Sequence, residues 1–493
     1  MKRIVFGLFS LFLAGLLAFS SCDVVEIPVA PEEKAELRFD INVVNATDPA
    51  TRSVKTEWED GDRIFVFFKK NGSSGSMGQS QYLTITFNGN THSWDAPVFS
   101  GISADNLGSG GTMYGIFFPC GARFVHDPAY TGSDFRLFYG DGNTNEALNN
   151  YPIFYYYMLD TGSVYTVTES IVSGTLSMVL PDNFVYFYID AADGKFNQSE
   201  KYRLCVEGVK PAMVSHWQSG SFHEIALPEG LPMWGYKYGN GIAFAGIMDS
   251  SWSAPETPHQ LVFFSDGDPA MTKTLSGKTL TSHASVKLSA PTAANGWVRY
   301  MMPPDVENIA GINWSKWFLG STGADDVTSK VTFRWAEIVP DRGDNEDQYF
   351  PSLPRHSLTG DYAIFDPARA ILGAEWRMPS RSDYASLVAN STLTSNSNWF
   401  TFTSGENSIR FATHNVLYDS GGSNYLWTSE IADNTFCYVR EYHYGQNLFS
   451  EVSSGTAASV RRTMGSNFVR PVYIGSNSVN GSVNLGEYEP VGW

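Results

Sequence analysis

Charged residues are scarce in this chain, since Lys, Arg, Asp and Glu make up only 17% of its 493 residues. Cations are the scarcer sign: 33 Lys and Arg stand against 51 Asp and Glu, which gives a formal net charge of −18. A chain with that balance repels polyanions, and no basic run interrupts it. Nucleic-acid binding is therefore excluded as its main role.

Catalytic and metal-binding motifs are lacking as well. The sequence has no Gly-x-Ser-x-Gly elbow, no Cys-x-x-Cys dithiol and no His-Glu-x-x-His motif among its nine histidines. Residues 141–152 have calcium-loop spacing but lack the glycine and glutamate of such a loop, and the acidic stretch 341–347 is typical of a solvated loop. We expect no enzyme, no metal and no cofactor; an enzyme acting on carbohydrate is the weakest alternative.

Cysteines number only four. Cys120, Cys205 and Cys437 lie in the apolar, strand-like stretches "FFPCG", "RLCVE" and "TFCYV". The pattern predicts small buried residues. An exported protein could join two of them in a disulfide, and the sequence leaves the pairing open.

Long apolar runs are limited to the N-terminus. A basic pair precedes the uncharged apolar residues 4–20, as in a secretory signal. The stretch ends in "AFSSC", whose small residues before Cys22 resemble the lipobox of bacterial lipoproteins. The resemblance implies a signal peptide over 1–21, acyl chains on Cys22 that anchor the protein to the outer membrane, and an acidic tether over 22–36. A short membrane-spanning segment is the alternative.

Hydrophobic residues, aromatic residues and glycine are abundant, at 43%, 14% and 45 residues. This composition supports packed cores joined by many turns. The length exceeds what one core serves, so two or three domains are expected. Alternating apolar and polar residues, as in 37–43, recur at short intervals between turns through the first 300 residues. They predict a mainly β protein with two β-sandwiches, over 37–165 and 166–303.

Helix signals are confined to the C-terminal third. Asp366 is placed as an N-cap, Pro367 as the first helical residue and Gly373 as the stop of a short helix. Ser380 and Asp383 have the spacing of a capping box at the start of a second helix.

Strand-like segments follow these two helices, which predicts an α+β domain over 330–474. The residues on either side are assigned as a linker, 304–329, and a polar tail, 475–493.

The first two domains resemble the fimbrillin-like, or Mfa-like, family of bacterial surface lipoproteins over about residues 37–303. The stretch "TRSVKTEWEDGDRIFVFF" (51–68) has the family's tryptophan, Trp58, then its Gly-Asp pair and an apolar strand. "YGIFFPCG" and "FFSDGDPAMTKTLSGKTL" (263–280) are similar to later strands of the family. The resemblance implies two transthyretin-like sandwiches and a role as a pilus subunit.

The same resemblance implies proteolytic processing. Family members are cut after an arginine near the mature N-terminus, and Arg52 is the matching residue. The cut removes the first strand and opens a groove, which a strand of another subunit fills, because unpaired edge groups are a template for a strand. An ordinary loop arginine is the alternative for Arg52.

The C-terminal domain resembles the major paralogous domain family (FISUMP), which is similar to C-type-lectin-like folds, over about 330–474. A glycine, a Trp-Arg-Met-Pro-Ser run, a Trp-Thr-Ser strand and a Val-Arg-Pro-Val ending occur in the family's order. Of a further family run only Trp335-Ala336 remain. The motif residues are Trp376, Arg377, Pro379, Trp427, Arg470 and Pro471.

We interpret these motif residues as structural. Trp376 is expected to fill the core, and Arg377 to bind backbone carbonyls or a carboxylate near 469–472. Pro379 should keep the two helices apart, because the residue before a proline avoids helical backbone. The Glu-Pro-Asn, Gln-Pro-Asp and Trp-Asn-Asp motifs of calcium-dependent lectins are absent, so a lectin-like fold does not establish sugar binding.

The combined features predict an exported, lipid-anchored cell-surface protein, a fimbrial tip or accessory adhesin assembled by strand complementation. The added C-terminal domain would keep the tail from donating a strand, so the subunit could accept a strand but not extend the fibre. Expected partners are other fimbrial subunits and a glycan or protein ligand on host or bacterial surfaces. The alternative is a surface glycan-binding lipoprotein that does not polymerise.

Overall fold

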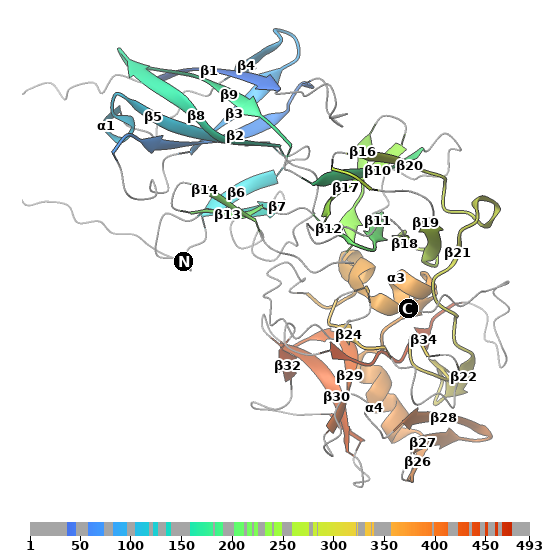
Figure 1. Cartoon of the computed structure of the whole chain (residues 1–493). Coiled ribbons are helices and arrows are strands. Elements are labelled where there is room, and N and C mark those ends of the chain that lie inside the picture. Colours follow the sequence, from blue (N-terminus) through green and yellow to red (C-terminus); the bar gives the residue numbers. More distant parts are fainter. Residues whose placement is uncertain are drawn as a thin grey trace, which may run out of the picture. The chain divides into compact units, whose positions relative to one another are not determined.

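The computed structural model is mainly β, as the sequence predicts (Figure 1). Its strands form several separate sheets and its helices are few and short. The structure describes residues 37–45, 58–72, 82–95, 104–117, 122–126, 135–139, 158–180, 183–190, 202–211, 214–218, 221–224, 232–238, 241–248, 259–275, 280–282, 284–321, 323, 331–336, 338–339, 356–396, 399–412, 423–432, 436–443, 449–451, 459–461 and 466–475.

The first sheet has seven strands in the order β1-β9-β8-β5-β2-β3-β4. Among them only β1 and β9 run parallel, and β1 lies at the edge. A single helical turn, α1, precedes β5. The bounds are β1 Arg38–Asn45, β2 Arg63–Lys70, β3 Tyr82–Asn88, β4 Ser93–Asp95, α1 Ala104–Leu107, β5 Gly110–Phe117, β8 Met158–Thr168 and β9 Ile171–Met178.

The second sheet has ten strands, eight of them in the order β20-β10-β17-β12-β11-β18-β19-β21, with β15 beside β11 and β16 beside β17. Its one described parallel pair, β10 with β20, is again at an edge. The bounds are β10 Phe184–Asp190, β11 Arg203–Val206, β12 Val209–Pro211, β15 Met233–Trp234, β16 Tyr236–Tyr238, β17 Gly241–Met248, β18 His259–Phe264, β19 Met271–Leu275, β20 Ser285–Leu288, η1 Ala293–Asn295 and β21 Val298–Arg299.

A small four-stranded sheet combines two hairpins from different segments of the chain. Strand β7 of the first hairpin pairs with β13 of the second. The order is β14-β13-β7-β6, with bounds β6 Ala122–His126, β7 Phe135–Tyr139, β13 Val214–Gln218 and β14 Ser221–Glu224.

In the C-terminal region, the described residues form four small sheets and three short helices. The sheets are β22-β23-β34-β25, β24-β33, β26-β27-β28 and β29-β30-β31, with β32 also on β30. The bounds are β22 Val306–Ile309, β23 Ile312–Ser315, β24 Phe333–Arg334, η2 Gly360–Phe365, α3 Pro367–Leu372, β25 Trp376–Arg377, α4 Arg381–Ala389, β26 Thr392–Ser395, β27 Trp399–Ser404, β28 Asn407–Ala412, β29 Ser423–Ile431, β30 Phe436–His443, β31 Phe449–Glu451, β32 Ser459–Arg461, β33 Ser466–Asn467 and β34 Val472–Tyr473.

One predicted domain limit falls inside a strand, and one predicted linker contains two strands. The limit between 165 and 166 lies within β8, whose hairpin partner β9 completes the first sheet. The segment 304–329, assigned as a linker, holds β22 and β23, which pair with β34 near the end of the chain. Composition and turn signals do not predict which distant strands pair. The pairings of β8 with β9 and of β23 with β34 were therefore not evident from the sequence.

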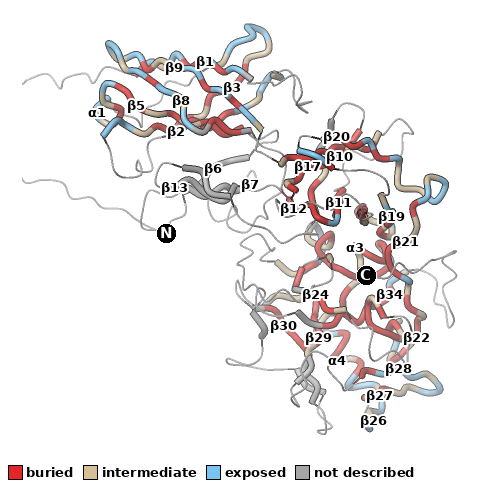
Figure 2. Tube along the Cα trace, in the orientation of Figure 1, coloured by how far each residue is buried: buried red, intermediate tan, exposed pale blue. Residues whose placement is uncertain are grey.

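The second sheet is buried on both faces. In Figure 2 its strands β10, β11 and β17 are drawn mostly in the colour of buried residues. One set of their side chains forms a core of its own, which includes Leu204 and Phe244. Alternate residues belong instead to the core of the first sheet, as Tyr186 does, or to that of the C-terminal region, as Cys205 does.

Candidate functional site

The predicted lipidation and cleavage residues, Cys22 and Arg52, lie outside the residues that the structure describes. Strand β1, which lies between them in the sequence, is described. The site therefore begins with the way β1 is held.

Strand β1 is paired along its full length with β9, from Arg38 opposite Ile171 to Asn45 opposite Met178. Its side chains alternate between the core and the surface, as a half-buried strand requires. Leu37, Ile41 and Val43 are buried. On the other face, residues 38, 40, 42 and 44 are exposed.

An aromatic side chain of β1 also enters the core. Phe39 packs on Phe68 of β2, with the ring centroids 5.9 Å apart. Phe68 in turn contacts the ring of Tyr165 on β8 at 5.2 Å. Strand β1 thus packs on apolar side chains of the first sheet, a position suited to a strand with apolar side chains at alternate positions.

Trp58 is the tryptophan of the fimbrillin-like signature and follows β1 in the sequence. Its ring makes edge contacts with Trp94 of β4 at 5.0 Å and with Phe117 of β5 at 5.1 Å. The turn that follows is closed by hydrogen bonds, among them Gly89 N–H to the Asp60 carboxylate at 2.8 Å. Trp58 therefore fixes the chain to the first sheet independently of β1.

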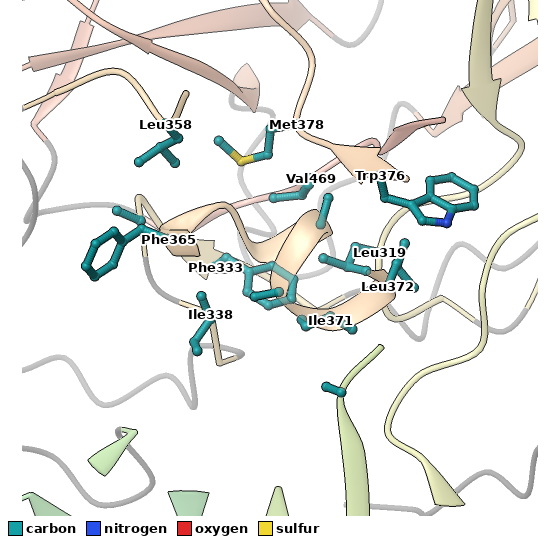
Figure 3. Close-up of a cluster of buried hydrophobic side chains, with 14 of the residues drawn as sticks. Leu319, Phe333, Ile338, Leu358, Phe365, Ile371, Leu372, Trp376, Met378 and Val469 are labelled. Atoms are coloured by element: carbon teal, nitrogen blue, oxygen red, sulfur yellow. The ribbon is translucent and has the colours of Figure 1, made fainter. Parts of the chain in front are cut away.

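In the C-terminal region, Trp376 is only 2% exposed. Its strand β25 pairs with β34, where Trp376 lies opposite Tyr473, and the two rings meet edge to face at 5.1 Å. Trp376 belongs to the C-terminal core cluster shown in Figure 3. The side chain fills the core and offers no surface to a ligand.

Arg377 is held by the next helix. Its guanidinium donates to both carboxylate oxygens of Asp383, at 2.5 and 3.1 Å, and to the Met378 carbonyl at 3.0 Å. Asp383 also completes the capping box of α4, accepting from Ser380 N–H at 2.6 Å while the Ser380 hydroxyl accepts from Asp383 N–H at 3.1 Å. Burial acts to raise the pKa of Asp383, but the hydrogen bonds from Arg377 and Ser380 outweigh it and hold that pKa below its usual value. The carboxylate that binds Arg377 thus lies on α4, while Arg377 itself pairs with Val472 of β34.

Asp366 ties the start of α3 to the end of the Trp-Arg-Met run. One carboxylate oxygen caps the helix by accepting from Ala368 N–H at 2.9 Å and Arg369 N–H at 3.3 Å. The other accepts from Met378 N–H at 2.7 Å. The sequence predicted the cap, whereas the bond to Met378 depends on tertiary structure. Burial raises the pKa of Asp366 to about 6, although the three N–H groups and Arg377 oppose that rise.

We expect the stability of the C-terminal region to fall as the pH rises from about 4 to about 6. The folded pKa of Asp366 lies above its usual value of 3.8, so the folded state binds more protons than the unfolded state in this window. Ionisation then costs about 3 kcal/mol, at 1.36 kcal/mol per pKa unit. Asp383 acts in the opposite direction: its contribution is present above its ordinary pKa of 3.8 and is lost as the pH falls from there through its lowered folded pKa, below this window.

The measurement is urea unfolding of the wild type and of D366N at pH 4, 5, 6 and 7. The amide introduced by D366N cannot ionise, so the difference in unfolding free energy between the two proteins should change across pH 4–6 and be constant from 6 to 7. A difference that is the same at all four pH values would contradict the assignment of Asp366.

Trp427 and Trp335 connect β29 and the end of β24 through two hydrogen bonds, one donated by each indole. The Trp427 indole N–H donates to the Phe333 carbonyl at 2.6 Å, and the Trp335 indole N–H donates to the Thr428 carbonyl at 3.1 Å. Both side chains are fully buried. The sequence indicated Trp335 only as part of Trp335-Ala336, the two residues that remain of the further family run. It did not predict this hydrogen bond.

Arg470 is a buried cation, 1% exposed. It lies between the rings of Phe318 and Phe411, at 4.9 and 4.7 Å from their centroids. Its Nη2 donates to the carbonyls of Lys316 at 2.7 Å and Arg410 at 2.6 Å. Arg470 thus joins the loop after β23 to β28.

Both motif prolines accept hydrogen bonds through their carbonyls. Pro379 O accepts from Ser429 N–H at 2.8 Å, and Pro471 O accepts from Ser315 N–H at 2.9 Å. All six motif residues are therefore engaged within the fold.

Other candidate ligands do not come together in the described residues. Within them, no group of three His, Cys, Asp or Glu side chains could hold a metal ion. Cys205 and Cys437 are buried, as the sequence predicts. Cys120 lies outside the described residues, as do the stretches 141–146 and 341–347. None of the described helices has the length and apolar character of a membrane span.

Comparisons with known proteins bring out similarity to bacterial surface proteins. No protein-family model matches the chain, and no curated protein matches it in sequence. A fimbrial protein from Bacteroides ovatus is 10% identical, with a TM-score of 0.24, over 89% of this chain and 99% of its own. A candidate cell adhesion protein from Bacteroides fragilis is 12% identical, with a TM-score of 0.25, over 52% and 92%. A candidate adhesin from Bacteroides ovatus is 10% identical, with a TM-score of 0.23, over 56% and 99%. Because these TM-scores are below 0.5, the similarities alone establish neither a shared fold nor a shared function.

Proposed function

We propose that this protein is an exported, lipid-anchored cell-surface subunit, a fimbrial tip or accessory adhesin that accepts a strand from another subunit in place of β1. The observation that carries the proposal is the edge strand β1, which precedes Arg52 in the sequence and is followed by the separately fixed Trp58. The solved structures reported above are named a fimbrial protein, a candidate cell adhesion protein and a candidate adhesin; their TM-scores give them no weight in the argument.

The geometry of β1 supports its replacement. Both its backbone and its side chains are engaged by the sheet, by pairing with β9 and by burial of Leu37, Ile41 and Val43. A cut after Arg52 would leave β1 joined to the rest of the protein by these contacts alone. An incoming strand with the same alternation could form all of them again.

The parallel edge strand of the second sheet differs in this respect. Strand β20 is followed by a turn in which Trp297 is buried and donates its indole N–H to Ser289 O at 3.2 Å. On its other side, Tyr186 N–H donates to Ala284 O at 2.8 Å. Because β20 is fixed on both sides, no single cut would release it, and the role of an exchangeable strand belongs to β1.

We further propose that the first two sheets are the transthyretin-like sandwiches of a fimbrillin-type subunit and that the C-terminal region is its lectin-like addition. In this proposal the subunit accepts a strand from another subunit and terminates or decorates a fibre. We propose no catalytic role for the motif residues, whose hydrogen bonds serve the fold.

An arginine-specific protease tests the proposal. We expect one cut in the intact protein, and N-terminal sequencing of the large fragment should begin at Ser53. The variant R52Q should resist, while R38Q, altered within β1, should be cut as the wild type is. If the wild type resists the protease, or if R52Q is cut equally well, release of β1 by cleavage after Arg52 is contradicted.

The alternative is a surface lipoprotein that binds glycans and does not polymerise. It is favoured only by the resemblance of 330–474 to lectin-like domains. Glycan binding by the full-length protein, together with an uncleaved Arg52, would support it over the fimbrial role.

A further inference from the structure

One face of the second sheet is apolar and does not belong to that sheet's own core. Along β11, Leu204 and Val206 lie in the sheet's own core, whereas Cys205 lies in the C-terminal core. Strand β18 alternates in the same way and places Val262 and Phe264 in the C-terminal core. Successive side chains of a strand point to opposite faces, so one whole face of these strands is buried against the C-terminal region.

The elements that cover this face are η2 and α3. Phe365 of η2 packs on Trp234 of β15, with the ring centroids 5.8 Å apart. Ile371 and Leu372 of α3 lie in the same cluster, which Figure 3 shows. These side-chain contacts are hydrophobic.

Backbone hydrogen bonds fix the register of this contact. Ala270 N–H donates to Ile371 O at 3.0 Å, and Ala374 N–H donates to Gly267 O at 2.8 Å. A Cβ on Gly373, whose φ is +105°, would meet Gly267 O at 3.2 Å and Pro269 at 3.3 Å. The glycine that ends α3 thus also lies where the two chain segments approach closely.

Two arginines cross the contact in opposite directions. Arg203 of β11, 1% exposed, donates to Ile364 O at 2.5 Å. Arg369 of α3 donates to the Asp266 carboxylate through Nε at 3.1 Å and Nη2 at 3.0 Å. Arg203 is thus buried and is hydrogen-bonded across the contact.

We infer that the β11–β15–β18 face of the second sheet is a docking surface for η2 and α3 of the same chain, and that the C-terminal region is a permanent layer of this sheet. The C-terminal region is then no module attached by a linker. It keeps this apolar face from contacting another subunit, and any adhesive surface must lie on its other sides. The inference does not depend on the proposed function.

A cut between the two parts tests the inference. Met302 is 44% exposed, so a protease recognition sequence can be inserted between Met302 and Pro303 of the full-length protein. After cleavage, the two fragments should elute together in size-exclusion chromatography at micromolar concentration, as the uncut protein does. Separate elution, or precipitation of either fragment after the cut, would overturn the inference.

A charge exchange gives a second readout on the same cleaved protein. D266R should speed dissociation of the fragments about two- to fivefold, as expected for a partly exposed ion pair, and R369D added to it should restore the original rate. The matched control is K287D, which breaks the exposed Lys287–Asp190 pair on the second sheet away from the contact. If K287D changes the rate as much as D266R, or if R369D fails to rescue, the assigned contact is wrong.

Discussion

Replacing Trp376 by alanine should lower the free energy of unfolding of the C-terminal region by about 3–5 kcal/mol, the range for a large buried aromatic side chain. Trp376 is 2% exposed and packs edge to face on Tyr473. Its cluster also holds side chains of the second sheet, so the cavity would weaken both. Urea unfolding of the full-length protein measures the change.

The matched control is Trp399, which is only partly buried on β27. W399A should lower the free energy of unfolding clearly less than W376A does. If W376A unfolded at the wild-type urea concentration but had lost binding to a ligand, the motif would be a binding site and its structural interpretation would be wrong.

Loss of β1 should destabilise the first sheet by about 5 kcal/mol or more. Burial of one large aliphatic side chain contributes roughly 1.5–3 kcal/mol, and three such side chains, Leu37, Ile41 and Val43, leave the core with β1. The measurement compares thermal unfolding of the intact protein with that of protein cut after Arg52 and stripped of its N-terminal fragment in mild denaturant.

A peptide of residues 37–45 should restore most of this stability when added in trans, because it can pair with β9 in the same register. The control peptide carries serine in place of Ile41 and Val43, and it should have little effect. Equal rescue by both peptides would show that the position beside β9 does not select for apolar side chains.

The sequence predicted local structure better than long-range arrangement. The capping box of Ser380 and Asp383 and the N-cap Asp366 are set by neighbours in the chain, and the structure contains all of them. The pairing of β23 with β34, near the end of the chain, left no local signal. Strand pairing of this kind depends on which apolar faces meet, and composition does not encode it.

The sequence indicated that the motif residues belong to one domain, but it did not predict all of the contacts that they make. Arg377 was expected to bind backbone carbonyls or a carboxylate near 469–472. It donates to the Met378 carbonyl and to the carboxylate of Asp383, which lies six residues ahead on α4. The contact of Arg369 with Asp266 was not foreseen, because a pair of oppositely charged residues about 100 positions apart has no distinguishing pattern. Only the tertiary fold brings them together.

Hydrogen exchange on β9 tests strand complementation most directly. In the intact protein, the β9 amides that face β1 should be protected. After the cut at Arg52 and removal of β1, these amides should exchange rapidly, while those of β2 and β5 remain protected; a complementing strand should restore the protection. If β9 stays protected without β1, or if no added strand restores its protection, β1 does not occupy an exchangeable site and the proposed assembly mechanism is wrong.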